Sequence, residues 1–174
     1  MGVLMFTARV HDLIYQKSNV EYKLLKLTRK LRDLQQYAST IANGGISIGD
    51  LLNSPGSMMG RTMRYLNYAH NNAMLYAQQQ APYIQQFYMR NMPNLNAQQQ
   101  QQLQKYMMVS LYTQGRNMAM QVETRNLKGE EERLAQDKER LEALSKEIDA
   151  DLEAAKKGRD ASIQAMAPKY TANG

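Results

Sequence analysis

Residues 10–41 read VHDLIYQKSNVEYKLLKLTRKLRDLQQYASTI, and this stretch decides the fold. Positions taken alternately three and four residues apart form a series in which nine of ten members are apolar or small. The series is Val10, Leu13, Lys17, Val20, Leu24, Leu27, Leu31, Leu34, Ala38 and Ile41. Such spacing places a narrow stripe along one side of a helix, and another helix normally covers a stripe of this kind. The stretch therefore predicts a coiled-coil helix that needs a helical partner.

Composition extends this prediction to the whole chain. The 174 residues suffice for one domain with a core of its own, and three of the four prolines lie between Pro55 and Pro93. No run alternates between apolar and polar residues, as a half-buried strand would. The predicted class is all-α. We expect an elongated helical hairpin or coiled coil in which the N-terminal helix packs on a long C-terminal helix, with short helices between them.

Breakers and caps divide this single domain, residues 1–174, into four segments. They are an N-terminal coiled-coil helix at 8–42, a Met/Tyr-rich region of short helices and turns at 43–96, a long C-terminal helix at 97–157 and a tail at 158–174. Thr7 is a plausible N-cap, and the Asn43-Gly44-Gly45 turn supplies glycines that can end the first helix.

The middle segment contains further start and stop signals. Ser47 and Asp50 have the spacing of a capping box, which predicts a short helix through Leu52. A helical pattern then runs over 57–80, and Pro82 is expected to end it and open a second brief helix. The C-terminal helix is expected to begin after a cap at Asn94 or Asn96.

The C-terminal helix carries a thinner stripe. Apolar residues recur every seventh position at Met120, Leu127, Leu134, Leu141, Ile148 and Ala155, joined by Leu144 and Leu152. The other core position of the heptad holds Glu130, Asp137 and Asp151. We expect residues 97–157 to form one continuous helix. Gly115 and Gly129 each weaken it by about 1 kcal/mol relative to alanine, so a kink or break at either is the main alternative. Gly158 is expected to end the helix.

Charge supports an antiparallel pairing of the two terminal helices. The chain carries a net charge of +6, but residues 1–34 hold +4 and residues 123–160 hold −3. Opposite charges along paired helices set partner and register. Lys17 interrupts the N-terminal stripe, where it can fix the register or form an ion pair between subunits.

Two sets of residues are the candidate functional sites. The predicted helix-pairing and assembly interface consists of Val10, Leu13, Val20, Leu24, Leu27, Leu31, Leu34 and Ile41, with Leu127, Leu134, Leu141, Leu144, Ile148 and Leu152. Residues 58–121 contain ten of the thirteen methionines and seven of the eleven tyrosines. This enrichment indicates either an adaptable partner surface or ordinary core filling. The candidate partner surface consists of Met59, Met63, Tyr65, Tyr76, Tyr88 and Met107.

Several function classes have little support. The chain has no cysteine, and its two histidines, His11 and His70, lie far apart in no recognised motif. Carboxylates alternate with Lys and Arg, which is typical of a salt-bridged helix surface. We therefore expect no enzyme activity, no cofactor and no metal. No apolar stretch approaches the ~20 residues of a membrane span, and residues 3–6 are too short for a secretory signal.

These observations favour a structural protein that polymerises with itself through terminal helix pairing, as the subunit of a filament, tube or comparable secretion-type or virion assembly. The layout of paired terminal helices around a differing middle resembles that of type III secretion filament and needle subunits and of flagellins. This resemblance covers arrangement only and carries over no residue. Further structural or secretion components are additional expected partners, and the location is either extracellular by signal-less export or cytoplasmic or virion-associated.

Two alternatives remain open. The first is a basic helical protein that binds nucleic acid or a virion, because five basic residues crowd the first helix. They are Lys23, Lys26, Arg29, Lys30 and Arg32. The second is a helical adaptor or chaperone that holds a partner on residues 58–121.

Overall fold

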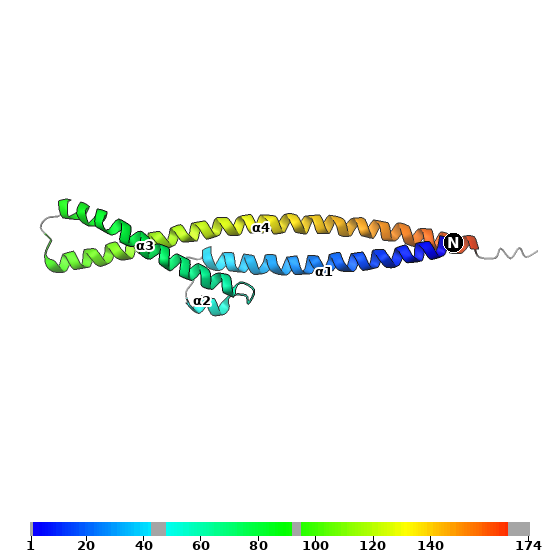
Figure 1. The fold of residues 1–174 in the computed structure, drawn as a ribbon, viewed down its shortest axis with the longest axis horizontal. Coiled ribbons are helices and arrows are strands. Elements are labelled where there is room, and N and C mark those ends of the chain that lie inside the picture. The colour runs from blue at the N-terminus through cyan, green and yellow to red at the C-terminus, as the bar shows by residue number, and fades with distance from the viewer. Residues whose placement is uncertain (1, 43–47, 92–94, 167–174) are drawn as a thin grey trace, which may run out of the picture. The chain divides into compact units, whose positions relative to one another are not determined.

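A computed structural model describes residues 2–42, 48–91 and 95–166 of the chain. The helices are α1 (Gly2–Ala42), α2 (Ile48–Asn53), α3 (Met59–Asn91) and α4 (Ala97–Met166). No strand occurs within these described ranges. The N-terminal helix α1 packs on the long C-terminal helix α4 (Figure 1). The predicted all-α fold, with its two terminal helices paired, is therefore confirmed.

The chain forms two compact units, and α1 and α4 contribute to both. One unit, here called the seam unit, contains Met1–Leu31 and Arg133–Gly174. The other, here called the Met/Tyr unit, contains Arg32–Glu132 and therefore includes α2 and α3. Each unit has a core of its own.

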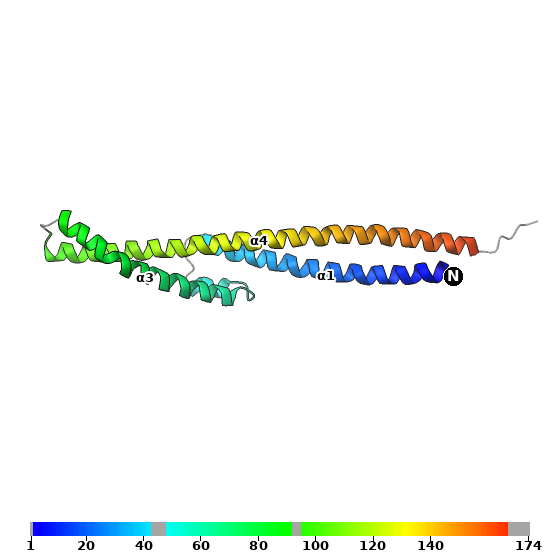
Figure 2. The same ribbon diagram turned by 45° about the horizontal axis from the view of Figure 1, so that its top comes forward.

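The core of the seam unit is the predicted heptad stripe. α1 and α4 lie side by side there in Figures 1 and 2. Their buried cluster comprises Val10, Leu13, Val20, Ile148, Leu152 and Ala155, with Leu24 and Leu141 packed against it half-buried. The helices run antiparallel, because Lys17 pairs with Asp149 while Arg9, nearer the N-terminus, pairs with Asp151. Large aliphatic side chains at heptad spacing thus hold this unit together.

Lys17 lies within the seam and is paired inside the chain. Its Nζ is 2.6 Å from Oδ1 of Asp149 on α4 and 3.8 Å from Oε1 of Glu21 one turn along α1. The hydrogen bond to Asp149 raises the pKa of the ammonium group. Lys17 therefore fixes the register of α1 on α4, and the predicted alternative of an ion pair between subunits is not needed to satisfy its charge.

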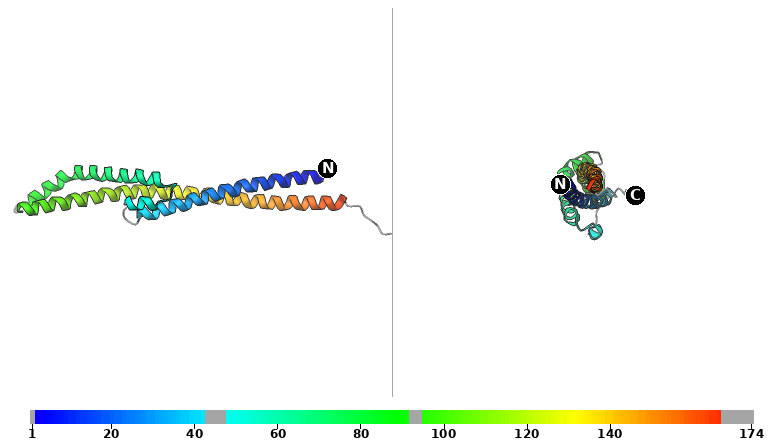
Figure 3. Two further views of the ribbon diagram at one scale, coloured as in Figure 1. Left: turned by 90° about the horizontal axis from the view of Figure 1, so that it is seen from below. Right: turned by 90° about the vertical axis from the view of Figure 1, so that its right-hand side faces the viewer.

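The Met/Tyr unit packs by a different pattern. Buried residues recur every fourth position on α3, at Tyr65, Ala69, Ala73 and Ala77, and on α4, at Met107, Leu111, Gly115 and Ala119. Rows spaced by four residues favour an oblique helix crossing, whereas heptad spacing favours near-parallel axes. Figures 1 and 3 show α3 lying against the first part of α4 in this unit. The end of α1 adds Leu34, Tyr37 and Ile41 to the same core.

Gly115 permits the close approach of α3 and α4. A Cβ atom at Gly115 would lie 2.7 Å from the Cα of Ala73 and 3.2 Å from the Cβ of Tyr76. Real Cβ atoms essentially never come so near a backbone atom, so a side chain at this position would push the helices apart. Glycine weakens an isolated helix, but here it allows the helix contact. The predicted long C-terminal helix is confirmed to continue through both Gly115 and Gly129.

Pro82 does not end a helix, contrary to the prediction. α3 runs without interruption from Met59 to Asn91 with Pro82 inside it, so the two short helices predicted there are one long helix. Proline removes one backbone hydrogen bond and costs about 3 kcal/mol in a helix interior. Tertiary packing on both sides of the proline offsets this cost. The half-buried residues there include Gln80, Ala81, Ile84 and Tyr88.

Some helix ends also differ from their predictions. α1 begins at Gly2 rather than near Thr7, whose hydroxyl donates to the carbonyl of Val3 inside the helix. α4 continues past Gly158 because that glycine accommodates the ring of Phe6, 2.7 Å from where its Cβ would be. The cap at Asn96 is confirmed. Its side-chain Oδ1 accepts a hydrogen bond from the backbone N–H of Gln99 at 2.8 Å. Its own backbone N–H donates to the side-chain Oε1 of Gln99 at 3.0 Å.

The structure describes only part of some other predicted segments. The short helix α2 is present at Ile48–Asn53, close to its predicted position. The glycine turn at 43–45, the capping side chains of Ser47 and Asp50, and residues 167–174 of the predicted tail lie outside what the structure describes. Residues 158–166 are helical, so the tail is shorter than predicted.

Candidate assembly surfaces

Most of the predicted helix-pairing residues lie between α1 and α4 of one chain. Val10, Leu13, Val20, Leu34, Ile41, Leu127, Leu134, Ile148 and Leu152 are buried. Leu24, Leu27, Leu31 and Leu141 are half-buried. Leu144 is exposed, with 41% of its surface accessible. The pairing of α1 with α4 within one chain thus covers most of the heptad stripe.

The six residues of the predicted partner surface do not share one face. Met59 and Met63 are exposed, whereas Tyr65 and Met107 belong to the core of the Met/Tyr unit. Tyr76 and Tyr88 are half-buried. The predicted set therefore mixes two faces, because the packed face of α3 follows the small residues Ala69, Ala73 and Ala77 rather than its methionines.

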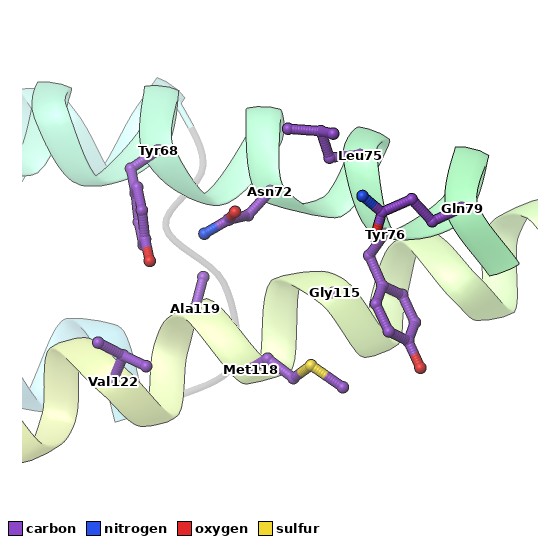
Figure 4. A pocket seen from close by; sticks show the side chains of 9 residues that line it. All are labelled: Tyr68, Asn72, Leu75, Tyr76, Gln79, Gly115, Met118, Ala119 and Val122. Carbon is purple, nitrogen blue, oxygen red and sulfur yellow. The ribbon is translucent and has the colours of Figure 1, made fainter.

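A groove between α3 and α4 in the Met/Tyr unit was not predicted from the sequence. It encloses about 280 Å³, with Gly115 and Ala119 of α4 among its lining residues. Figure 4 shows Tyr68, Asn72 and Leu75 of α3 above Met118 and Val122 of α4. Between 45% and 53% of the surface of Tyr68, Leu75, Met118 and Val122 is accessible. Spacing of three and four residues from Tyr68 through Leu75 was the signal that could have revealed it.

Arg61 joins α3 to α4 beside this groove. Its Nε lies 2.7 Å from Oε1 of Glu123, and its Nη1 pairs with Glu130. The hydroxyl of Tyr37 on α1 donates to the same Oε1 of Glu123 at 3.2 Å. Burial, and secondarily the charge of Glu123, raises the pKa of Tyr37 well above its ordinary value. With both carboxylates paired to one guanidinium, this arrangement ties three helices together.

A hollow extends from this cluster along α3. Arg61, Arg64, Tyr65, Tyr68 and Glu123 line a space of about 320 Å³. It shares Tyr68 with the apolar groove. At this end of the groove Arg64 lies beside Arg61, whose charge is paired with Glu123 and Glu130.

The seam unit has a basic groove of its own. Lys23, Lys26, Lys30 and Arg140 surround Leu27 and Leu141, with Asp137 as its one acidic residue, and the space is about 400 Å³. Three of the five basic residues predicted to crowd the first helix thus meet a basic residue of α4. The ammonium group of Lys26 also lies 4.5 Å from the centre of the Tyr22 ring, a cation–π contact.

The described part of the chain gives no support for a metal site. Within those residues no group of three or more His, Asp or Glu is placed to hold a metal ion. His70 is engaged by the hydroxyl of Tyr112, 2.8 Å from its Nδ1. Among the described helices, none is both long and apolar enough to cross a membrane.

Comparison with known protein families, with curated proteins and with solved structures finds no match to this chain. The geometry thus defines a class, an all-helical protein with a coiled-coil seam and a small-residue helix contact. A function must be argued from the exposed surfaces.

Proposed function

We propose that the chain is a structural, self-assembling subunit of a helical filament, tube or comparable secretion-type or virion assembly. The observation that carries the proposal is the open groove of the Met/Tyr unit. Tyr68, Leu75, Met118 and Val122 stay about half accessible although the core beneath them is complete. Contiguous apolar side chains of this kind mark interaction sites on soluble proteins.

The terminal helices pair within the chain, so the proposal assigns polymerisation to the faces which that pairing leaves exposed. Tyr and Met suit such contacts, since tyrosine supplies large area with a polar tip and the thioether of methionine adapts to different neighbours. Other exposed methionine, aromatic and valine side chains of α3 and α4 lie outside the groove lining. They include Met74, Tyr83, Phe87, Met89, Tyr106, Met108 and Val109.

The test uses purified protein, examined by negative-stain electron microscopy and by light scattering over a range of concentrations. We expect regular polymers or large oligomers from the natural sequence. Met118→Glu places a charge in the groove and should abolish or strongly reduce them, because an unpaired carboxylate is costly to bury. Asn117→Glu adds the same charge at the exposed neighbouring position and should assemble normally.

The natural protein remaining a monomer up to its solubility limit would contradict the proposal. If Met118→Glu assembled as well as the natural protein, the groove would not be the contact through which the copies assemble. Circular dichroism of both variants verifies that the helices are intact.

The basic groove of the seam unit favours nucleic-acid binding as a second candidate function. Lys23, Lys26, Lys30 and Arg140 can neutralise phosphates, and such binding weakens steeply as salt rises. Titration of labelled single- and double-stranded DNA at several salt concentrations tests it, with Lys26→Glu and Lys30→Glu as weakened variants. Binding that is absent or independent of salt rejects this candidate. The adaptor or chaperone function would instead yield one stoichiometric partner from the native host.

A further inference from the structure

α1 carries a second stripe, on the side opposite its seam with α4. Its members are spaced four and three residues apart, at Leu4, Ala8, His11, Tyr15, Ser18, Tyr22 and Leu25. At about 100° per residue these positions fall almost diametrically across the helix from Val10, Leu13 and Val20. We call this set the outer stripe. All seven residues are exposed in the seam unit.

The large residues of the outer stripe are among the more exposed apolar residues of the seam unit. Leu4 is 80% accessible, Tyr15 69%, Tyr22 58% and Leu25 51%. No formally charged residue interrupts the stripe over these seven positions. A helix with two such stripes on opposite sides is suited to two helical partners, and α4 supplies only one of them.

The order of side chains in the outer stripe identifies the second partner. Read in either direction, the stripe begins and ends with leucine and has Tyr15 at its centre. If two copies meet antiparallel about Tyr15, Leu4 faces Leu25, Ala8 faces Tyr22, and His11 faces Ser18. Each tyrosine away from the centre then meets a small side chain, which is how facing helices fill space without voids. A parallel pairing would instead set tyrosine on tyrosine and alanine on alanine, leaving gaps.

We propose that α1 of one copy pairs antiparallel with α1 of a second copy through the outer stripe, about a two-fold axis at Tyr15. Such an interface is isologous, so it joins copies in pairs and leaves the Met/Tyr unit free to continue an assembly. A buried aromatic contributes about 150–250 Å², so two tyrosines and two leucines from each copy bring the interface to roughly the 1,000 Å² at which specific contacts begin.

This inference rests on the proposed function and names the contact that it uses. The absence of cysteine in the chain allows a direct test with single cysteines and a short bifunctional thiol crosslinker. Tyr15→Cys should crosslink to itself, because the axis brings the two residues 15 together. Leu4→Cys and Leu25→Cys should each fail alone but crosslink to one another when mixed. The control Gln16→Cys, exposed on another face of the same turn, should not crosslink.

Each other result overturns the antiparallel pairing. Self-crosslinking of Leu4→Cys indicates parallel helices, and equal crosslinking of Gln16→Cys indicates random collision. Electron microscopy of the same samples separates the two proposals. Polymers without a Tyr15→Cys crosslink reject the pairing and leave the self-assembling function standing, whereas neither polymers nor crosslinks reject both.

Discussion

The seam unit and the Met/Tyr unit bury their helices in opposite ways. In the seam unit large aliphatic residues, such as Leu13 and Ile148, fill the space between α1 and α4 at heptad spacing. In the Met/Tyr unit Ala73 and Gly115 bring α3 and α4 so close that little side chain fits between them. The contact in the seam unit depends on large side chains that fill the space between the helices. The contact in the Met/Tyr unit depends on small residues that leave no side chain between them. Removing atoms should therefore damage one unit, and adding atoms should damage the other.

The largest expected effect is a loss of volume in the seam. Leu13 is 1% accessible, so Leu13→Ala should lower the free energy of unfolding by about 2–5 kcal/mol, through lost burial and the cavity left behind. The matched change Ile14→Ala lies at a position 47% accessible and should stay within about 0.5 kcal/mol. Urea unfolding at low protein concentration, followed by circular dichroism, measures both. Equal losses would mean that the seam is not the core of its unit.

The second test adds one methyl group at two glycines of the same helix. Gly115→Ala should destabilise by about 1–3 kcal/mol, because its Cβ would overlap the Cα of Ala73. Gly129→Ala meets nothing within 4 Å and should stabilise by about 0.5–1 kcal/mol through higher helix propensity. Thermal unfolding gives the sign of each change. A stabilising Gly115→Ala would refute the close contact and with it the contrast between the units.

Ion pairs differ between the units as well, with a smaller expected effect. Arg61 is 24% accessible in its side chain and faces Glu123 at 16%, whereas Arg9 and Asp151 are 52% and 55% accessible. Arg61→Met removes the cation that Glu123 and Glu130 share and should cost about 1–3 kcal/mol. Arg9→Met should cost about 0–1 kcal/mol, as exposed pairs do. Urea titrations at low and high salt compare them, and equal costs would remove this distinction.

The smallest effect is a change in pH dependence from Tyr37. Burial raises its pKa in the folded protein, so above about pH 10 the unfolded chain releases this proton while the folded chain retains it. The contribution of Tyr37 to stability is therefore constant below about pH 10 and falls as pH rises further, by up to about 1.4 kcal/mol per pH unit. Tyr37→Phe should fall less steeply than the natural protein. The free energy of unfolding of both proteins, measured from about pH 8 to about pH 11, tests this prediction. Equal slopes against pH for the two proteins would contradict it.

The seam could be predicted from the sequence because a heptad pattern is local. The spacing from Val10 to Ile41 fixes which side of α1 is apolar, and the stripe from Leu127 to Leu152 does so for α4. Opposite charge bias then indicated an antiparallel pair. Asn96 was likewise predictable, because capping by Gln99 depends on residues three apart.

The Met/Tyr unit could not be predicted to the same depth. Which of Met63 and Tyr65 is buried depends on where α4 crosses α3, and composition carries no record of that crossing. The apolar groove depends on the same crossing, because five of its nine lining residues come from α3 and four from α4. The outer stripe of α1 could have been found from residue spacing alone. It is less apolar than the seam stripe, which runs along the same helix.

By itself the sequence determined the helical class, and it indicated the pairing of the terminal helices and a cap at Asn94 or Asn96, since these follow from residue spacing and charge along each helix. Only the tertiary structure decided that Pro82 stays inside α3, that Gly115 is a contact rather than a break and that Gly158 makes room for Phe6. Glycine and proline carry local costs of about 1 and 3 kcal/mol, and packing against a neighbouring helix can outweigh either. That neighbour is distant in the chain, and the sequence around each residue does not reveal it.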